Sequence, residues 1–552
     1  MKEKCDFILK ENQIYTLTAV DLGMEGEGVA KMSGIPVFVR GALPGEEFTA
    51  MITYAKKDYA FGRLISIIAP SSERRVPPCP AFGSCGGCDL QHMSDGLQAS
   101  FKKNAAENPL RKALGRDADF TVAPVVCGGL RFAYRNKLQM PFGYVGKRAV
   151  LGFFEGQSHK VVPLNECMLH GAWATTLIKT VLDWANSAGV TVYDERSGKG
   201  LLRHLVARKL STLSVTLVIN GYKIPAPERL SRALSAAFPD IGIYLSENRE
   251  NTNVIMTSPA VLIYGSGARE TLGGVSVSIA PESFLQVNDG VRDLLYDDVL
   301  RRLSPCGTVI DAYSGAGLLT AMIAKNRADK TGSGADGNTV CGGLDGNHVG
   351  GGKVYGIEIV PEAVKDADAL LRANGLSHAV ENICGDAAAE LPRLIKRLTE
   401  YTVTPAVSTD LRSACLQKNP PNTPKNTDCT DLSRFEKQCN DTENRVLSCS
   451  EKPANSAENR VLNADFNGSN TASDISVILD PPRKGVATEV ITALLEALPK
   501  QIIYISCNPA TLARDLKLLT AGGAYGITEI IPYDMFPQTK HVETLAVLVK
   551  KG

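Results

Sequence analysis

The first part of the chain alternates apolar and polar residues over short stretches that glycines separate. Residues 14–20 read IYTLTAV, and similar runs follow at 35–41, 46–55 and 62–68. A period of two residues is typical of strands with one buried face, and glycine favours tight turns between them. The pattern predicts a small, OB-like β-barrel of five short strands over residues 8–68. Such barrels often bind oligonucleotides, but packing and interface domains have the same pattern.

The pattern changes in the C-terminal half, where apolar strands alternate with helical stretches. Strand-like runs end at or near Tyr313, Glu358, Cys384, Asp480 and Cys507. Strands that alternate with helices form parallel sheets, whose carboxyl ends meet at one edge. The final stretch holds two strand-like runs without a helix between them. We therefore expect an α/β fold over 281–552, a Rossmann-like and mostly parallel sheet with an antiparallel C-terminal hairpin.

The rest of the chain divides into two further domains and two insertions. Residues 76–125 hold a cysteine-rich loop and a helix, and residues 126–280 read as a central α+β domain that we expect to bind RNA. Residues 327–352 are rich in Gly, Asp and Asn, and residues 402–474 are rich in Asn, Ser and Thr. Neither segment can bury enough apolar surface to offset its ordering entropy. We expect both to be flexible insertions in the C-terminal domain.

Charge restricts the partners that the chain can have. The 552 residues carry 60 Lys or Arg and 59 Asp or Glu, so the net charge of +1 gives no reason to expect a polyanionic partner overall. The exception is 100–148, where ten basic residues stand against three acidic ones with aromatic residues among them. This segment fits the phosphates and bases of RNA, and it fits a solvated strand face equally well.

Apolar runs are too short for a membrane span, and the N-terminus lacks the pattern of a secretory signal. We therefore expect a cytoplasmic protein with no membrane association, and no obligate protein partner is evident. In a reducing compartment, clustered cysteines bind metal or do chemistry more often than they form disulfides. For the 14 cysteines of this chain we therefore consider metal binding and chemistry before disulfides.

A nucleotide site is predicted at the first strand of the C-terminal domain. The strand VIDAY leads into a turn with Gly315 and Gly317, and glycines let a ligand approach the backbone closely. The next strand ends at Glu358, whose carboxylate can accept two ribose hydroxyls. Thr320 stands where a dinucleotide site has its third glycine, so S-adenosylmethionine (SAM), which has no phosphate, is the better ligand. Asp386, after the third strand, either meets the adenine amino group or caps a helix.

Three residues lie at strand ends of the same edge, and one of them, Cys507, is a candidate nucleophile. Cys507 ends a buried strand just before a helix, whose N-terminus favours the thiolate over the thiol, although buried cysteines are also common in such places. Asp480 ends the preceding strand within DPPRKG, where Arg483 offers a bidentate donor. Glu543 begins the last strand, and without further context it reads as a surface carboxylate.

A cysteine loop forms a second candidate site. Cys79, Cys85 and Cys88 are separated by five and two residues. Four thiolates can hold either zinc or a 4Fe–4S cluster, so the spacing alone leaves the metal open. The fourth ligand is equally open, since both Cys127 and Cys167 lie downstream.

Together, these motifs resemble the bacterial RNA uracil-5-methyltransferases that carry an N-terminal TRAM barrel and an iron–sulfur centre. The resemblance rests on CPAFGSCGGC, SFLQVN, DAYSGAG, GIEIVPEAV, DPPRKG, SCNPATLARDL and HVETLAVLV, which occur in the family's order. It implies a SAM-dependent enzyme that methylates carbon-5 of a specific uridine in 23S ribosomal RNA. Methylation of a transfer-RNA loop and a non-catalytic role as an RNA-binding assembly factor are the alternatives.

The resemblance also implies roles for individual residues. Cys507 is the nucleophile that adds to uracil, and Glu543 is the base that removes the carbon-5 proton. The SAM-site positions of the family are matched by Gln286, Tyr313, Glu358 and Asp480, to which the residues themselves add Asp386. The ligands of the 4Fe–4S cluster are matched by Cys79, Cys85, Cys88 and Cys167. The target uridine must be single-stranded or flipped out, because a base inside a helix cannot reach a buried thiol.

Overall fold

The computed structural model describes residues 9–156, 158–303, 307–332, 352–400 and 474–551. Most of the two predicted insertions, 327–352 and 402–474, lies outside the described residues. Helix α5 (Leu318–Gly332) occupies the first positions of the former segment. Within the described ranges, every helix is too short or too polar to cross a membrane.

The N-terminal strands close into a barrel in the order β1-β2-β3-β5-β4. Every second side chain, for example Leu17, Val37 and Phe48, points into its interior and is buried. The barrel has the five short strands that the pattern predicts, and β2 has the weakest apolar signal because its buried positions are the small residues Gly28 and Ala30. The strands are β1 (Ile14–Leu22), β2 (Gly28–Met32), β3 (Ile35–Arg40), β4 (Glu47–Ala55) and β5 (Ala60–Ala69).

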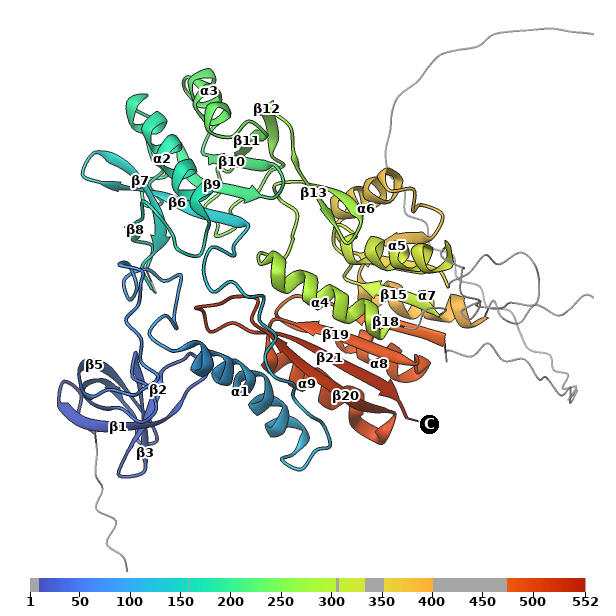
Figure 1. Cartoon of the computed structure of the whole chain (residues 1–552), viewed down its shortest axis with the longest axis horizontal. Coiled ribbons are helices and arrows are strands. Elements are labelled where there is room, and N and C mark those ends of the chain that lie inside the picture. Colours follow the sequence, from blue (N-terminus) through green and yellow to red (C-terminus); the bar gives the residue numbers. More distant parts are fainter. Residues whose placement is uncertain (1–8, 157, 304–306, 333–351, 401–473, 552) are drawn as a thin grey trace, which may run out of the picture. The chain divides into compact units, whose positions relative to one another are not determined.

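The middle of the chain forms a second, seven-stranded sheet in the order β12-β11-β10-β9-β6-β7-β8 (Figure 1). Helices α2 (Ala172–Ser187) and α3 (Pro227–Ala237) pack on each other and against this sheet through a shared apolar core. The strands are β6 (Lys137–Val145), β7 (Arg148–Phe154), β8 (Val161–Pro163), β9 (Leu202–Lys209), β10 (Leu213–Ile219), β11 (Ile241–Glu247) and β12 (Val261–Gly265).

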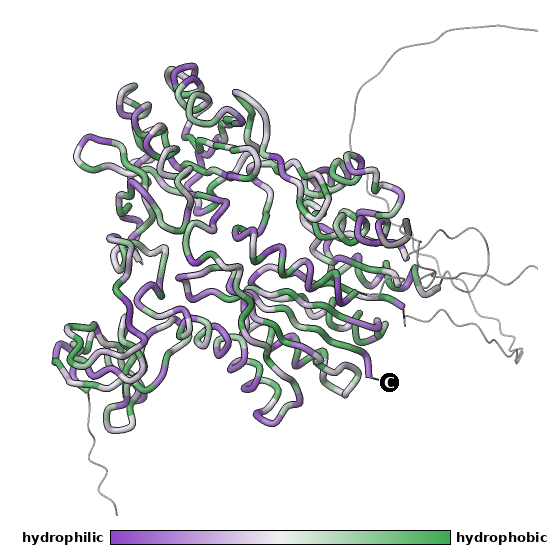
Figure 2. Tube along the Cα trace, in the orientation of Figure 1, coloured by the Kyte–Doolittle hydropathy of each residue, from purple (hydrophilic) through white to green (hydrophobic). Residues whose placement is uncertain are grey.

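The C-terminal sheet confirms the predicted α/β fold. Its order is β17-β16-β15-β18-β19-β21-β20. The first five strands pair in parallel, and β21 pairs antiparallel with both β19 and β20. Figure 2 shows mainly hydrophobic residues along the central strands, as expected for a sheet covered on both faces. The strands are β15 (Thr308–Ala312), β16 (Val354–Glu358), β17 (Val380–Cys384), β18 (Ile475–Leu479), β19 (Gln501–Ser506), β20 (Tyr525–Tyr533) and β21 (Glu543–Lys550).

Helices and one hairpin complete this domain. The hairpin of β13 (Ala268–Leu272) and β14 (Val275–Ile279) packs into the same apolar core as the C-terminal sheet. Besides α5, the helices are α4 (Asp289–Arg302), α6 (Pro361–Ala373), α7 (Ala387–Glu400), α8 (Thr488–Ala497) and α9 (Pro509–Thr520), with a short 3-10 turn, η2 (Ala521–Gly523).

Helix α1 (Asp95–Leu114) packs along α9 and carries a buried ion pair to the C-terminal domain. Asp534 lies between the ammonium of Lys102 and the guanidinium of Arg131, and it forms ion pairs with both. Arg131 also pairs with Asp95 at 2.8 Å. We call Lys102, Arg131 and Asp534 the paired cluster, because its charges are compensated within the protein.

Candidate functional site

The carboxyl edge of the C-terminal sheet brings the predicted strand-end residues together (Figure 1). Tyr313 follows β15, Glu358 ends β16, and Asp480 and Cys507 follow β18 and β19. Glu543 begins β21, which runs antiparallel to β19, so the start of β21 lies at the edge where the parallel strands end. A site at this edge is where open α/β sheets bind their ligands.

Cys507 and Glu543 lie beside each other on neighbouring strands. Ser506 pairs with Thr544 in the β19–β21 register, which brings the next position along each strand, 507 and 543, face to face. Burial and then the Glu543 carboxyl raise the pKa of the Cys507 thiol, and the Arg483 guanidinium opposes them. Burial and the neighbouring carboxyl thus oppose the thiolate, which the helix N-terminus is expected to favour.

Four carboxyl groups form a row at this edge. Asp480 interacts electrostatically with Glu543 and with Asp311, and Asp311 interacts with Glu358. Burial and then Asp311 raise the pKa of Asp480 to about 7. Burial also raises the pKa of Asp311 to about 6 and raises that of Glu543 well above its usual value. We call Asp311, Glu358, Asp480 and Glu543 the acidic edge.

The protein provides little compensation for these carboxyl groups. Glu543 is only 3% exposed, and among the described residues neither its carboxyl nor that of Asp480 has a hydrogen bond or an ion pair. Asp311 has one partner, since Thr320 Oγ1 donates to its Oδ2 at 2.6 Å. Arg483 is the cation that acts on Glu543. Glu358 accepts from the backbone N–H groups of Gly315 and Val360, and it is half-buried, as is Asp480. The carboxyl groups of Asp480 and Glu543, which have no partner in the described part of the chain, favour a cationic ligand such as a sulfonium or an ammonium.

The glycine turn after β15 has a strained and closely packed backbone. Tyr313 has a φ of 79°, a left-handed conformation that costs free energy for a bulky residue and that often marks a functional site. Gly317 has a φ of 77°, and a Cβ there would lie 2.7 Å from the Cβ of Ala367. The backbone N–H of Gly315 donates to Glu358 Oε2 at 3.0 Å, so this carboxylate also fixes the turn.

Asp386 borders the same edge, and Gln286 lies in the segment between β14 and α4. Asp386 Oδ1 accepts from the backbone N–H of Ala388 at 3.0 Å and so caps α7, the second of the two roles considered for it. Burial and then the Asp386 charge raise the pKa of Tyr313 to about 12, which places this carboxylate near the tyrosine ring. Gln286 is buried between β14 and α4, and its carbonyl accepts from Asn136 Nδ2 at 3.1 Å.

Two residues of the site were not among the predicted ones. Asp311 is an acid at a fully buried position of an apolar strand, a signal visible in VIDAY. Asp515 of α9 is also buried, and it accepts from Tyr504 Oη at 2.7 Å and from the backbone N–H of Val486 at 3.1 Å. Asp515 therefore fixes the end of the loop that carries Asp480.

The four cysteines assigned by resemblance line one cavity of about 110 Å³. Burial raises the pKa of Cys88 to about 12 and that of Cys167 to about 11, and Cys79 and Cys85 act on both thiols. Cys127 is exposed and does not line this cavity. Across the described residues, no three Cys, His, Asp or Glu side chains are close enough to hold one metal ion. The four thiols therefore share one cavity, but in the described part of the chain they are not arranged around a single metal position.

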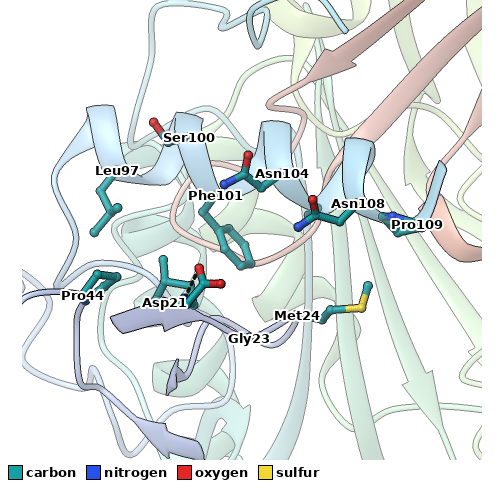
Figure 3. A pocket seen from close by; sticks show the side chains of 12 residues that line it. Asp21, Gly23, Met24, Pro44, Leu97, Ser100, Phe101, Asn104, Asn108 and Pro109 are labelled. Atoms are coloured by element: carbon teal, nitrogen blue, oxygen red, sulfur yellow. Dashed lines mark hydrogen bonds between the residues drawn. The ribbon is translucent and has the colours of Figure 1, made fainter. Parts of the chain in front are cut away.

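Another cavity lies between the barrel and α1 (Figure 3). Met24 and Asp21 from the β1–β2 region face Phe101, Asn104 and Asn108 of the helix. Its volume is about 120 Å³. Its lining includes none of the residues of the acidic edge, and we assign it no chemistry.

Two parts of the chain match known protein families. Residues 9–65 match the TRAM domain, and residues 460–551 match the family described as tRNA (Uracil-5-)-methyltransferase. The TRAM match covers the barrel strands β1 to β4 and half of β5. The second match includes the strand ends that carry Asp480, Cys507 and Glu543.

Relatives match over almost the whole chain. An uncharacterized RNA methyltransferase of Halalkalibacterium halodurans is 30% identical over 99% of this chain and 98% of its own. Another, of Caldanaerobacter subterraneus subsp. tengcongensis, is 31% identical over 98% of this chain and 99% of its own. Among solved structures, Pyrococcus abyssi tRNA (uracil-54, C5)-methyltransferase in complex with S-adenosyl-L-homocysteine is 22% identical with a TM-score of 0.64, covering 97% of this chain and 100% of that chain. This likeness confirms the fold.

Proposed function

Because the chain belongs to the TRAM-containing RNA uracil-5-methyltransferase family, we propose that this RNA methyltransferase uses SAM to methylate carbon-5 of a specific uridine in 23S ribosomal RNA. The reaction proceeds through a covalent bond between Cys507 and the uracil ring. The observation that supports this proposal is the pairing of a thiol with an unpartnered carboxyl, Cys507 beside Glu543, next to an acidic edge that favours a cation.

The chain supplies the nucleophile and the base of this reaction. Carbon-5 of uracil is a weak nucleophile until the Cys507 thiolate adds to carbon-6, which moves an electron pair toward carbon-5 as an enolate. Carbon-5 then accepts the methyl group, and Glu543 takes the proton that this carbon still carries. The electron pair left behind restores the ring double bond and expels the Cys507 thiolate. A raised proton affinity suits Glu543 for this role.

The residues of the acidic edge fit SAM. SAM supplies an activated methyl group on a positively charged sulfur. The uncompensated carboxyl groups of Asp311 and Asp480 provide the negative field that such a charge requires. The part of the site that we assign to the nucleoside of SAM lies at the glycine turn, which Glu358, Tyr313 and Asp386 border. Gln286 completes the proposed set of ligand-binding residues.

Because the anionic form of Cys507 is disfavoured, the pKa of this thiol must fall before it can react. A positive charge bound at the acidic edge lowers the pKa of the neighbouring Cys507, since it offsets the carboxylates that now raise it. Arg483, on the loop after β18, acts on the thiol in the same direction. The nucleophile is thus most reactive when the site is occupied, which limits side reactions of the thiol.

We also propose that Cys79, Cys85, Cys88 and Cys167 hold a 4Fe–4S cluster. Their common cavity supports this assignment, and the methyl transfer contains no redox step, so the cluster has a structural or RNA-positioning role. A Cys167→Ser variant is expected to lose bound iron and the cluster absorbance. Cys127→Ser is the matched control, because Cys127 lies outside the cavity. Unchanged iron content in Cys167→Ser would contradict the assignment.

Methyl-labelled SAM tests the reaction. The protein is incubated with ribosomal or transfer RNA, and the modified nucleoside is located by mass spectrometry. We expect label on carbon-5 of a uridine in 23S ribosomal RNA. The names of the matched family and of the Pyrococcus abyssi structure favour transfer RNA as the second candidate, and label found only there would establish it. Absence of label on any RNA would refute the methyltransferase proposal and favour the non-catalytic role as an RNA-binding assembly factor.

RNA containing 5-fluorouridine tests the covalent step. Fluorine cannot leave carbon-5 as a proton does, so the adduct with Cys507 accumulates and slows the protein on a denaturing gel. Cys507→Ala is expected to abolish this adduct. Cys384→Ala is the matched control, because Cys384 ends β17 at the same edge and is exposed. An adduct that survives in Cys507→Ala would remove this residue as the nucleophile.

A further inference from the structure

A pocket in the central domain collects basic side chains, and its lining is distinct from the acidic edge. Its lining consists of Arg135, Lys137, Gln139, Phe153, His170 and Val287, which we call the basic pocket, and its volume is about 220 Å³. Arg135 and Phe153 also line the cysteine cavity, so the two cavities share a wall. No residue of the acidic edge contributes to either lining.

Two cations stand directly opposite each other beside this pocket. Lys137 of β6 pairs with Arg208 of β9 in an antiparallel register, so both side chains lie on the same face of the sheet. Like charges in this arrangement repel each other, and Arg208 is only 2% exposed. Burial and then Arg208 and Arg135 lower the pKa of Lys137 to about 8. The fold therefore concentrates positive charge at a position where repulsion is poorly screened by solvent.

The protein leaves these cations without a paired acid, although Arg208 Nη2 donates to the Ser283 carbonyl at 2.7 Å. In the described part of the chain, Arg135, Lys137 and Arg208 form no ion pair. The nearby acids have other partners: Glu282 accepts from the backbone N–H of Ala260, and Asp289 pairs with Arg292.

Several buried donors also lack an acceptor. Arg135 Nε, Arg208 Nε and Nη1, and His170 Nδ1 have no hydrogen-bond partner, although each atom is buried. His170 itself is 5% exposed, and its other ring nitrogen, Nε2, contacts the Lys137 carbonyl at 2.9 Å. Unsatisfied buried donors are costly, so a group with several acceptor oxygens and a negative charge fits this pocket.

The basic pocket is connected to the proposed SAM site through one short segment. Asn136 lies between Arg135 and Lys137, its backbone N–H donates to the Val287 carbonyl at 2.9 Å, and its side chain donates to the Gln286 carbonyl at 3.1 Å. Val287 lines the basic pocket directly after Gln286 in the chain. A group bound in the pocket is therefore held on the same segment as a residue proposed to contact SAM.

We propose that the basic pocket binds a backbone phosphate of the substrate RNA, close to the uridine that enters the acidic edge. A phosphate offers acceptor oxygens to the Arg135 guanidinium and the Lys137 ammonium, which line the pocket, and a charge that offsets the repulsion of Lys137 with Arg135 and Arg208. A nucleobase offers no net charge and would leave the repulsion unrelieved. The identity of the ligand as RNA rests on the proposed function, whereas the preference for a phosphate rests on the pocket itself.

The salt dependence of RNA binding tests this proposal. Affinity for a short oligouridylate is measured at several salt concentrations for the full chain and for Lys137→Gln. Each phosphate contact with single-stranded RNA contributes about 0.7 to the slope of log affinity against log salt. We expect Lys137→Gln to lose about this much slope and to bind roughly three- to tenfold more weakly at low salt.

Two further variants serve as controls. Lys147→Gln removes an exposed lysine of the same hairpin, at the turn between β6 and β7, and is expected to retain the slope. Lys137→Arg keeps the charge and is expected to restore most of the affinity. Equal slopes for the wild type and Lys137→Gln, or equal losses in the two glutamine variants, would overturn the proposal.

Calorimetric titration with inorganic phosphate separates RNA from a free anion. Phosphate binding that Lys137→Gln abolishes, together with unchanged oligouridylate affinity, would assign the pocket to a free anion and overturn the RNA proposal. Methyl transfer is measured on the same preparations. A wild type that fails to methylate RNA but shows the expected slope difference would refute the proposed function and leave the phosphate pocket in place.

Discussion

The paired cluster and the acidic edge are both buried groups of charges, but only the first is compensated within the chain. In the paired cluster, Asp534 forms ion pairs with Lys102 and Arg131, and the Lys102 ammonium also donates to the Phe536 carbonyl at 2.8 Å. At the acidic edge, the described residues give Glu543 neither a hydrogen bond nor an ion pair. Isolated buried charge opposes folding, so its retention indicates a gain elsewhere.

The difference indicates which clusters serve the fold and which serve a ligand. The paired cluster joins α1 to the segment before β21, and together with Asp95 its charges cancel without any other molecule. The acidic edge has more carboxyl groups than Arg483 can balance, and the lining of the basic pocket holds no acid. Their missing charges correspond to those of a sulfonium and a phosphate, which are the two charged groups that SAM and RNA bring to the reaction.

Substitution of Glu543 is expected to give the largest effect. Glu543→Gln removes the group that accepts the carbon-5 proton, so methyl transfer should fall roughly 10²- to 10⁴-fold. The covalent adduct with ordinary uridine RNA should accumulate, because its release requires that proton to leave. Radiolabel transfer and a denaturing gel measure both quantities. Glu496→Gln, an exposed change on α8, is the control, and an unchanged rate in Glu543→Gln would exclude Glu543 as the base.

Matched aspartate variants test the comparison through stability. Asp534→Asn leaves Lys102 and Arg131 without their anion, so the free energy of unfolding should fall by about 3–5 kcal/mol. Asp480→Asn removes one of several repelling carboxylates and should leave stability unchanged or raise it. Denaturant titrations at neutral pH measure both. Equal losses in the two variants would show that the acidic edge is compensated after all.

The pH dependence of stability follows from the acidic edge and should be smaller. Folding raises the pKa values of Asp311 to about 6 and of Asp480 to about 7 from 3.8, so the folded protein binds protons more tightly than the unfolded chain. The resulting stabilisation is complete below pH 3.8 and is lost as pH rises to about 7. Across this window we expect stability to fall as pH rises, by about 1.4 kcal/mol for each unit by which folding raises a pKa.

Thermal unfolding at several pH values measures this loss, and Asp480→Asn should reduce it. SAM should raise the unfolding temperature more at pH 8 than at pH 5, because its positive charge is attracted only by ionised carboxylates. A SAM effect that is independent of pH would argue against a sulfonium at the acidic edge.

The sequence predicts the strands of the C-terminal sheet well because of how they are buried. Strands β18 and β19 are covered on both faces, so they appear as nearly continuous apolar runs, and the residues that follow them mark the carboxyl edge. Strand β2 has a weaker signal, because its interior positions are Gly28 and Ala30. Apolar periodicity thus locates strands with large buried side chains more readily than those with small ones.

Contacts between distant parts of the sequence could not be predicted in the same way. The meeting of Cys507 with Glu543 depends on the β19–β21 register, and that of Lys137 with Arg208 depends on the β6–β9 register. A register is set by the packing of whole sheets and not by local residue patterns. The resemblance supplied the first of these pairs, whereas the second emerged only from the structure.

The smallest expected effect concerns the one hydrogen bond of Asp311, donated by Thr320. Thr320→Val keeps the shape of the side chain and removes this donor, so the ionised carboxylate loses its partner at a cost of about 1 kcal/mol. The hydrogen bond lowers the pKa of Asp311, and the cost should therefore be larger at pH 8 than at pH 5. Thr492→Val on α8 removes an exposed hydroxyl and should have little effect at either pH. If the two variants lose equal stability at both pH values, Asp311 is not ionised in the folded protein and contributes no charge to the acidic edge.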